Sequence, residues 1–263
     1  MPNAPEIRIS SRTDGNGKTN EDSLIAIRQD QRAILCVADG VGGLDDGDIA
    51  SRYITKTLES WAQDKDVNQM GEKTTHRELQ SLVANLHEDL RAIAKEKYGD
   101  GSRQSLASTF VFAVVGLKKA VIECVGDSRA YVYQLGNCTQ VTVDQTAFMY
   151  DLVSGYNYDI LPDGLAKVLE EKTDREKDRL VMQSIGYGDR IPQPVRYTVP
   201  IVGNVDILLC SDGLSNTIRE YEIKRELEKQ QSGTQVLKNL IHLAKSRGET
   251  DNITGVLYRR RIG

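Results

Sequence analysis

The stretch Ile34–Gly43, ILCVADGVGG, decides the fold class of this chain, because an apolar run of strand length ends in Asp39 and a glycine. Short aliphatic runs bounded by Asp-Gly are typical of strands that leave a sheet through a turn. The same pattern recurs in DILLCSDGLS at 206–215, and IECVGDSRA at 122–130 is a variant of it. We therefore expect a chain built from short strands that carry acidic residues at their ends.

Further apolar runs predict strands at 23–27, 33–38, 106–115, 121–125, 130–135, 205–210 and 253–258. Apolar residues at helical spacing predict helices at 48–63, 76–97, 221–231 and 234–245. Strands that mostly follow one another, with helices arriving in pairs, favour an α+β fold over an alternating parallel sheet. We expect a four-layer sandwich, in which two stacked, mainly antiparallel β-sheets are flanked by helix pairs.

A single domain over residues 1–263 is expected, because no internal repeat or Pro-rich linker divides the sequence. One segment breaks the pattern of strands and helices. Residues 146–178 change from an aromatic, Gly-containing stretch to a densely charged one, and alternating charges are typical of a solvated helix. We interpret residues 146–178 as a flap inserted into the same domain.

The composition is that of a globular protein, with 39% hydrophobic and 27% charged residues among 263. The 34 Lys and Arg against 38 Asp and Glu give a net charge of -4, which disfavours binding to nucleic acid or to anionic lipid. No apolar run approaches the roughly 18 residues of a membrane span, and the first residues lack the pattern of a secretory signal. We expect a cytoplasmic protein without a membrane anchor.

The four cysteines indicate packing and not chemistry. Cys36, Cys124 and Cys210 lie within predicted strands, where a free thiol behaves as a small hydrophobic group. Cys138, in the turn-like sequence QLGNCTQ, is expected to be exposed. Because the three histidines are scattered and no Cys pair has the spacing of zinc ligands, a soft-metal site is disfavoured.

The acidic residues at strand ends suit a hard metal ion. Asp39, Asp212 and Asp127 follow strands, whereas Asp251 and the triplet at 20–22 precede them. If these sheet edges meet, the clustered carboxylates are stable in their charged form only with cations present, and oxygen ligands select Mg²⁺ or Mn²⁺. A single Asp-Gly is more often a simple turn, so the metal prediction depends on the recurrence of the pattern.

Six short motifs, in this order, resemble those of the metal-dependent type 2C (PPM) protein serine/threonine phosphatases, and in particular a bacterial single-domain member. They are NEDS (20–23), VADGVGG (37–43), LASTF (106–110), VGDSRAY (125–131), CSDGLSN (210–216) and ETDNIT (249–254). The resemblance covers nearly the whole chain and implies a β-sandwich of two antiparallel sheets flanked by helix pairs. It also places the family's flap, which lies beside the active site, at 146–178.

The resemblance implies two ions, Mn²⁺ or Mg²⁺, with Asp39 bridging them. Asp212 and Asp251 complete the shell of the first ion, and the carbonyl of Gly40 binds the second. Asp127 matches the ligand of a third, weaker ion.

Other matches imply roles around the ions. Glu21 and Asp22 orient metal-bound water by hydrogen bonds, and Asn252 supports the neighbouring aspartate.

Gly17 stands where the family usually has a phosphate-binding arginine. Lys18 and Arg12 are the remaining candidates for the phosphate anchor, and Lys18 as a simple loop residue is an equal alternative. Lysine lacks the two-pronged binding geometry of arginine, so weaker orientation of substrate is expected.

Val41 and Asn216 are two further departures. Val41 stands where eukaryotic members often carry a histidine that acts as general acid, a task that a metal-bound water can also perform. Asn216 replaces an aspartate, which should lower the affinity for the third ion and leaves a structural role for Asp127 as an alternative.

The resemblance implies hydrolysis of phosphoserine and phosphothreonine in proteins by direct attack of a metal-bridging water or hydroxide, with no phosphoenzyme. Phosphoproteins are the expected substrates, a serine/threonine kinase the expected counterpart, and a monomer the expected state. Two alternatives stay open: a catalytically weak relative that serves as a binding or regulatory module, and a phosphatase for small phosphate esters.

Overall fold

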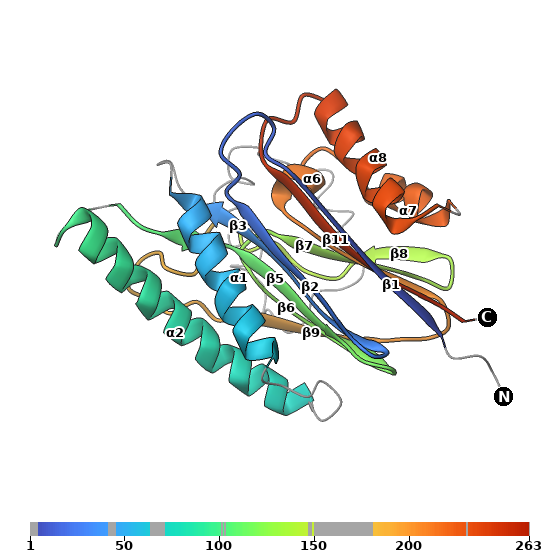
Figure 1. Cartoon of the computed structure of the whole chain (residues 1–263), viewed down its shortest axis with the longest axis horizontal. Helices are drawn as coiled ribbons and strands as arrows, with labels where there is room; N and C mark the ends of the chain where they lie inside the picture. Colours follow the sequence, from blue (N-terminus) through green and yellow to red (C-terminus); the bar gives the residue numbers. More distant parts are fainter. Residues whose placement is uncertain are drawn as a thin grey trace.

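The computed structural model describes residues 5–41, 46–63, 72–100, 102, 104–146, 149, 181–229 and 231–262. Two antiparallel β-sheets are stacked at its centre (Figure 1). The five-stranded sheet has the order β1 (Glu6–Asp14), β11 (Ile253–Arg261), β10 (Val205–Cys210), β7 (Arg129–Gln134) and β8 (Asn137–Gln140). The six-stranded sheet has the order β2 (Asp22–Gln29), β3 (Arg32–Val41), β5 (Phe110–Val115), β6 (Lys119–Val125) and β9 (Val195–Pro200), and β4 (Ala107–Ser108) pairs with β3.

Helices cover both outer faces of this sandwich. Helices α1 (Gly47–Gln63) and α2 (Glu72–Tyr98) lie on the six-stranded sheet, and α7 (Glu220–Glu228) and α8 (Gly233–Ser246) lie on the five-stranded sheet (Figure 1). A single short turn of helix, α6 (Asp212–Ser215), follows β10 directly. The predicted four-layer α+β sandwich is confirmed. No helix in the described parts of the chain is long and apolar enough to cross a bilayer.

The alternation of side chains along the strands explains the layers. In β5, Val111 and Ala113 face the other sheet, whereas Phe110 and Phe112 face the helices α1 and α2. A strand that is buried on both faces reads as a continuous apolar run, which is why this strand was evident from the sequence. Burial of the apolar side chains in three successive layers is the main contribution to the stability of the fold.

The structure departs from the predicted elements in several places. The strand expected at 106–115 is interrupted at Thr109, so that β4 and β5 are separate. Strands β1, β8 and β9 were not predicted. The exposure predicted for Cys138 is wrong, because this residue lies in β8 and only 9% of it is exposed, in the apolar layer that β8 shares with α7. The other three cysteines are free and buried, as expected.

Two predictions about domain organisation are not tested by the structure. The flap expected at 146–178 lies outside the described residues except for Thr146 and Met149. The single domain over residues 1–263 likewise stays a prediction.

Candidate active site

The antiparallel pairing of strands brings aspartates from distant parts of the sequence to one end of the sandwich. Asp22, at the start of β2, pairs with Asp39 near the end of β3. Asp212 follows β10, Asp251 precedes its antiparallel neighbour β11, and Asp127 follows β6 by two residues. Because the end of one antiparallel strand lies beside the start of the next, residues before and after strands meet at the same edge.

The backbone of Asp39 is fixed by the residues that separate β4 from β5. Its carbonyl accepts hydrogen bonds from the Thr109 amide and from the Ser108 hydroxyl, both at 2.8 Å. The Thr109 hydroxyl in turn contacts the hydroxyl of Ser128 at 2.8 Å, next to Asp127. The interruption at Thr109 therefore links the Asp39 strand to the Asp127 loop.

A buried serine joins the two sheets beside Asp22. The hydroxyl of Ser211 donates to Asp22 Oδ2 at 2.9 Å and accepts the amide of Thr254 at 3.0 Å. The other oxygen of Asp22, Oδ1, is buried without a hydrogen-bond partner. The sequence analysis gave no role to Ser211 or Thr254, although both lie in motifs that it quoted, directly before Asp212 and within ETDNIT.

Glu21 lies between the first residues of α1 and the last strand. Its amide donates to Asn252 Oδ1 at 2.8 Å, and its Oε1 accepts the amide of Gly47 at 3.2 Å. Gly40 is also packed against the start of α1, since a Cβ added to it would lie 2.3 Å from the carbonyl oxygen of Gly47. Only glycine fits at position 40, and its backbone is thereby held next to the aspartates.

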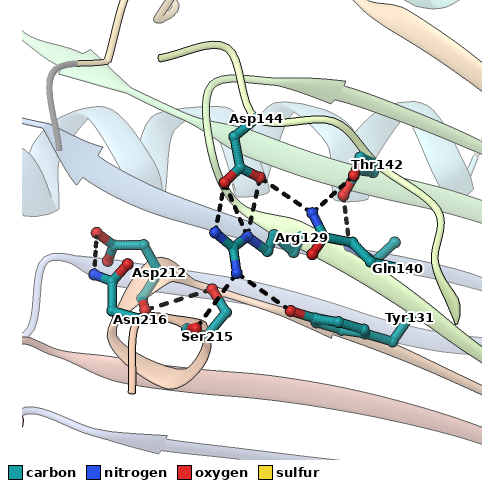
Figure 2. Close-up of polar contacts among 9 residues, drawn as sticks. Arg129, Tyr131, Gln140, Thr142, Asp144, Asp212, Ser215 and Asn216 are labelled. Atoms are coloured by element: carbon teal, nitrogen blue, oxygen red, sulfur yellow. Dashed lines mark hydrogen bonds and ion pairs between the residues drawn. The ribbon is translucent and has the colours of Figure 1, made fainter. Parts of the chain in front are cut away.

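Helix α6 carries Asp212 at its first residue, and Asn216 caps it. The Asn216 amide Nδ2 donates to Asp212 Oδ2 at 3.0 Å, and its backbone N–H bonds the Asp212 carbonyl at 2.7 Å (Figure 2). Asp212 Oδ1 is buried without a hydrogen-bond partner. Asn216 thus acts on the same carboxyl group that the sequence analysis expected to bind an ion.

Burial and mutual repulsion raise the pKa values of these carboxyl groups. Burial, followed by the charges of Asp22, Asp212, Asp127 and Asp251, raises the pKa of Asp39 well above its ordinary value. Burial is also the first cause for Asp22, whose pKa rises to about 7. Burial likewise raises the pKa of Asp127 to about 8, with Asp212 as the next cause. Burial and repulsion therefore favour a bound proton or a bound cation in this cluster.

The residues fit a hard divalent cation, although no three acidic, His or Cys side chains among the described residues are already arranged as a coordination shell. Asp22 Oδ1 and Asp212 Oδ1 are buried and unpartnered, which is costly unless a cation or proton compensates them. Burial, followed by the charge of Asp251, raises the pKa of Asp212 above its ordinary value, so this carboxyl group favours a bound proton or cation. An all-oxygen donor set of this kind suits Mg²⁺ or Mn²⁺.

Comparison with known proteins agrees with this geometry. A family model described as Protein phosphatase 2C matches residues 11–253. The chain belongs to the protein phosphatase 2C family. The serine/threonine phosphatase stp of Listeria innocua is 27% identical over 257 residues, covering 97% of this chain and 93% of that protein.

Solved structures of the protein phosphatase 2C type share the fold. A bacterial serine phosphatase superimposes with a TM-score of 0.78 at 25% identity, covering 97% of this chain and 98% of that one. The catalytic domain of the phosphatase PstP, solved with two manganese ions, gives a TM-score of 0.75 at 25% identity over 98% of this chain and all of that one. The expected family, its fold and the class of phosphoprotein phosphatases are confirmed.

Two basic residues, Lys18 and Arg12, were candidates for the phosphate anchor of this protein phosphatase 2C domain. Lys18 is exposed and closes a turn by donating its amide to the Gly15 carbonyl, which also accepts the Asn252 amide side chain at 3.0 Å. Arg12 is exposed on β1 and lies near the carboxylate of Asp14. The Lys18 turn is therefore joined directly to the residue beside Asp251, and both cations stay candidates.

The histidines of the chain lie away from the aspartates. Val41, which stands where eukaryotic family members often have a histidine, pairs with Ala107 of β4. His76 contacts Glu123 at 2.9 Å, and His87 accepts the amide of Gly186 at 3.0 Å. A histidine general acid has no support among the described side chains.

Proposed function

We propose that the chain is a divalent-metal-dependent protein phosphatase that hydrolyses phosphoserine and phosphothreonine. The observation that carries this proposal is the convergence of five aspartates from both sheets at one end of the sandwich, with two buried oxygens unpartnered. Membership of the protein phosphatase 2C family and the stp relative of L. innocua support the substrate class.

Asp39, Asp212 and Asp251 would hold one ion, and Asp39 with the carbonyl of Gly40 would hold a second, either Mn²⁺ or Mg²⁺. The orphaned oxygen of Asp212 and the close packing of Gly40 support this assignment. When bound, the ions lower the pKa of water and neutralise phosphoryl oxygens. Asp127 would hold a third, weaker ion.

The chain's own side chains would orient the attacking water. Asp22, fixed by Ser211 on one oxygen, keeps its other oxygen available as an acceptor. Glu21 is held by its backbone bond to Asn252 and acts beside Asp22. Water attacks phosphorus directly, the bond to the serine or threonine oxygen breaks, and that oxygen takes up a proton, with no phosphoenzyme.

Lys18 is the favoured phosphate anchor, with Arg12 as the alternative. Lys18 belongs to the turn that Asn252 ties to the Asp251 segment, and it supplies charge without the two-pronged geometry of arginine. The flap at 146–178 would border the site and influence the access of substrate.

Phosphoproteins are the proposed substrates, and a serine/threonine kinase is the proposed counterpart, so that the protein would act in signal transduction as a monomeric, single-domain enzyme. The four free cysteines suit a reducing compartment, which supports a cytoplasmic location. A catalytically weak binding or regulatory module is the second candidate, favoured by Gly17 and Asn216 at positions where the family motif has charged residues.

Hydrolysis of a phosphothreonine peptide in the presence of Mn²⁺ tests the proposal. Asp39→Asn should reduce turnover to the level seen with chelator, while the variant stays folded because one repelling carboxylate is removed. Asp89→Asn is a matched control, since Asp89 is exposed on α2 and accepts the Tyr53 hydroxyl of α1. Turnover that survives Asp39→Asn would end the proposal, and peptide binding without turnover at saturating Mn²⁺ would favour the binding module.

A further inference from the structure

A partly buried ion pair lies beside helix α6 and has no role in the proposed chemistry. Arg129, the first residue of β7, donates from Nε to both oxygens of Asp144, at 2.9 and 3.0 Å, and from Nη2 to Oδ2 at 2.6 Å. The two side chains are 23% and 15% exposed. The Gln140 amide side chain also contacts Asp144 Oδ1, at 3.4 Å (Figure 2). Asp144 therefore holds the guanidinium in one fixed orientation.

The remaining nitrogen of this guanidinium points at the helix that carries Asp212. Arg129 Nη1 donates to the carbonyl of Ser215 at 3.3 Å and lies 3.4 Å from the hydroxyl of Tyr131 (Figure 2). Ser215 is the last residue of α6, whose terminal carbonyls lack partners within the helix. The helix is only four residues long, so fixing its last carbonyl also fixes its first residue, Asp212.

All three nitrogens of the guanidinium already donate to groups of this chain. Nε and Nη2 bind Asp144, and Nη1 binds the two oxygens beside α6, so these contacts hold Arg129 in a structural position and do not direct it at a substrate. Its effect must pass through the groups that it holds. One of these groups is the Ser215 carbonyl of α6, and α6 also carries Asp212, whose Oδ1 is buried without a hydrogen-bond partner.

We propose that Arg129, held by Asp144, is a positioning residue that fixes α6 so that the Asp212 carboxylate faces Asp39 and is ready to bind a divalent cation. This inference rests on the proposed function, because it assigns Asp212 to the metal site. Groups that orient metal ligands typically change metal affinity by about 10- to 100-fold when they are replaced.

Arg129→Lys separates geometry from charge. Lysine keeps the positive charge but has a single nitrogen, so it cannot bind both oxygens of Asp144 and the Ser215 carbonyl at the same time. Asp144→Asn is the second variant, since it loosens the guanidinium without changing Arg129. Both variants should shift Asp212 without removing any proposed ligand.

The chain contains a matched control in Arg259, which binds Asp206 through the same two nitrogens at 3.0 Å each and donates its third to the carbonyl of Gln231. This pair is more deeply buried than Arg129 and Asp144, and it adjoins β10 at the opposite end of that strand from Asp212. Arg259→Lys therefore removes the same two-pronged contact at the far end of β10, where Arg261 still binds Asp206.

Calorimetric titration of the full chain with Mn²⁺ tests the inference. Arg129→Lys should bind Mn²⁺ about 10-fold more weakly or worse, Asp144→Asn should change in the same direction, and Arg259→Lys should bind as the unaltered protein does. The Mn²⁺ concentration for half-maximal hydrolysis should rise in step, with an unchanged KM for peptide at saturating Mn²⁺.

Each other outcome has a defined meaning. Unchanged Mn²⁺ affinity in Arg129→Lys and Asp144→Asn overturns the inference and leaves the proposed function intact. Equal losses in Arg129→Lys and Arg259→Lys also overturn it, because the pair would then support only the general stability of the fold. Absence of Mn²⁺ binding by the unaltered protein overturns the proposed function and this inference with it.

Discussion

Replacing Asn216 by Asp reverses the contact that now stabilises the carboxylate of Asp212. The Asn216 amide donates to Asp212 Oδ2 at 3.0 Å, so Asn216→Asp removes a donor and puts a second carboxylate in its place. Two like charges about 4 Å apart repel by about 1 kcal/mol in water and about 4 kcal/mol near a protein surface. Because Asn216 is exposed, screening limits the penalty, and we expect a loss of about 1–2 kcal/mol in the metal-free protein.

Thermal unfolding with chelator and with Mn²⁺ measures this effect. For a domain of this size, 1–2 kcal/mol corresponds to a fall in Tm of about 2–8 °C in chelator. Mn²⁺ should then raise the Tm of Asn216→Asp by more than it raises that of the unaltered protein, because the added carboxylate becomes a ligand. Asn216→Ala is the control, since it removes the amide without adding charge, and Mn²⁺ should raise its Tm by no more than it raises that of the unaltered protein. Equal stability of Asn216→Asp and the unaltered protein in chelator would refute the reasoning.

Two further predictions concern burial and close packing. Burial raises the pKa of Glu123, which contacts His76, to about 8. The buried group is therefore most compatible with the fold when it is protonated, so its contribution to the free energy of unfolding is complete below pH 4.5 and is lost as the pH rises towards 8. Glu123→Gln cannot titrate and should gain up to about 1.4 kcal/mol per pH unit relative to the unaltered protein between pH 5 and 8 in urea unfolding. In Glu222→Gln, the control, that difference should stay constant, because the pKa of Glu222 is lowered. A Cβ at Gly213 would lie 2.1 Å from the Asn252 carbonyl, so Gly213→Ala should weaken Mn²⁺ binding in calorimetry, and unchanged binding would contradict this packing argument.

The elements that could be predicted from the sequence are those in which consecutive residues are apolar and buried. Strand β5, FVFAVV, is buried on both faces, and its continuous apolar run predicts a central strand. Strand β1 was missed because Ile7 and Ile9 are its only apolar residues, and it lies at the edge of its sheet. Cys138 was misplaced because its polar neighbours indicated a turn, whereas its burial depends on α7, more than 80 residues later in the chain.

The acidic residues of the site could be predicted from the sequence, but the hydrogen bonds that hold them in place could not. Antiparallel pairing places Asp212 beside Asp251 and Asp22 beside Asp39, but these pairs belong to different sheets. From the sequence they could be grouped only on the condition that the two sheet edges meet, or through the family motifs. The bond from Ser211 to Asp22 spans 189 positions, and the bond from Arg129 to Ser215 spans 86. Such contacts depend on the stacking of the sheets and on the register of β7 against β10, which no local pattern encodes.

Strand β10 has a buried acidic residue, Asp206, near one end, and Asp212 lies two positions beyond the other end, in different electrostatic surroundings. Asp206 is fully buried, and the side chains of Arg259 and Arg261 bond to it at 3.0 and 2.7 Å, so that end is closed by the chain's own cations. Asp212 has only a neutral amide on one oxygen and no partner on the other. Two arginine side chains of β11 thus compensate the charge of Asp206, whereas no arginine among the described residues bonds the carboxylate of Asp212. Because an uncompensated buried carboxylate is costly, its retention beside four other aspartates is explained if a cation from solution completes the site, as the proposed function requires.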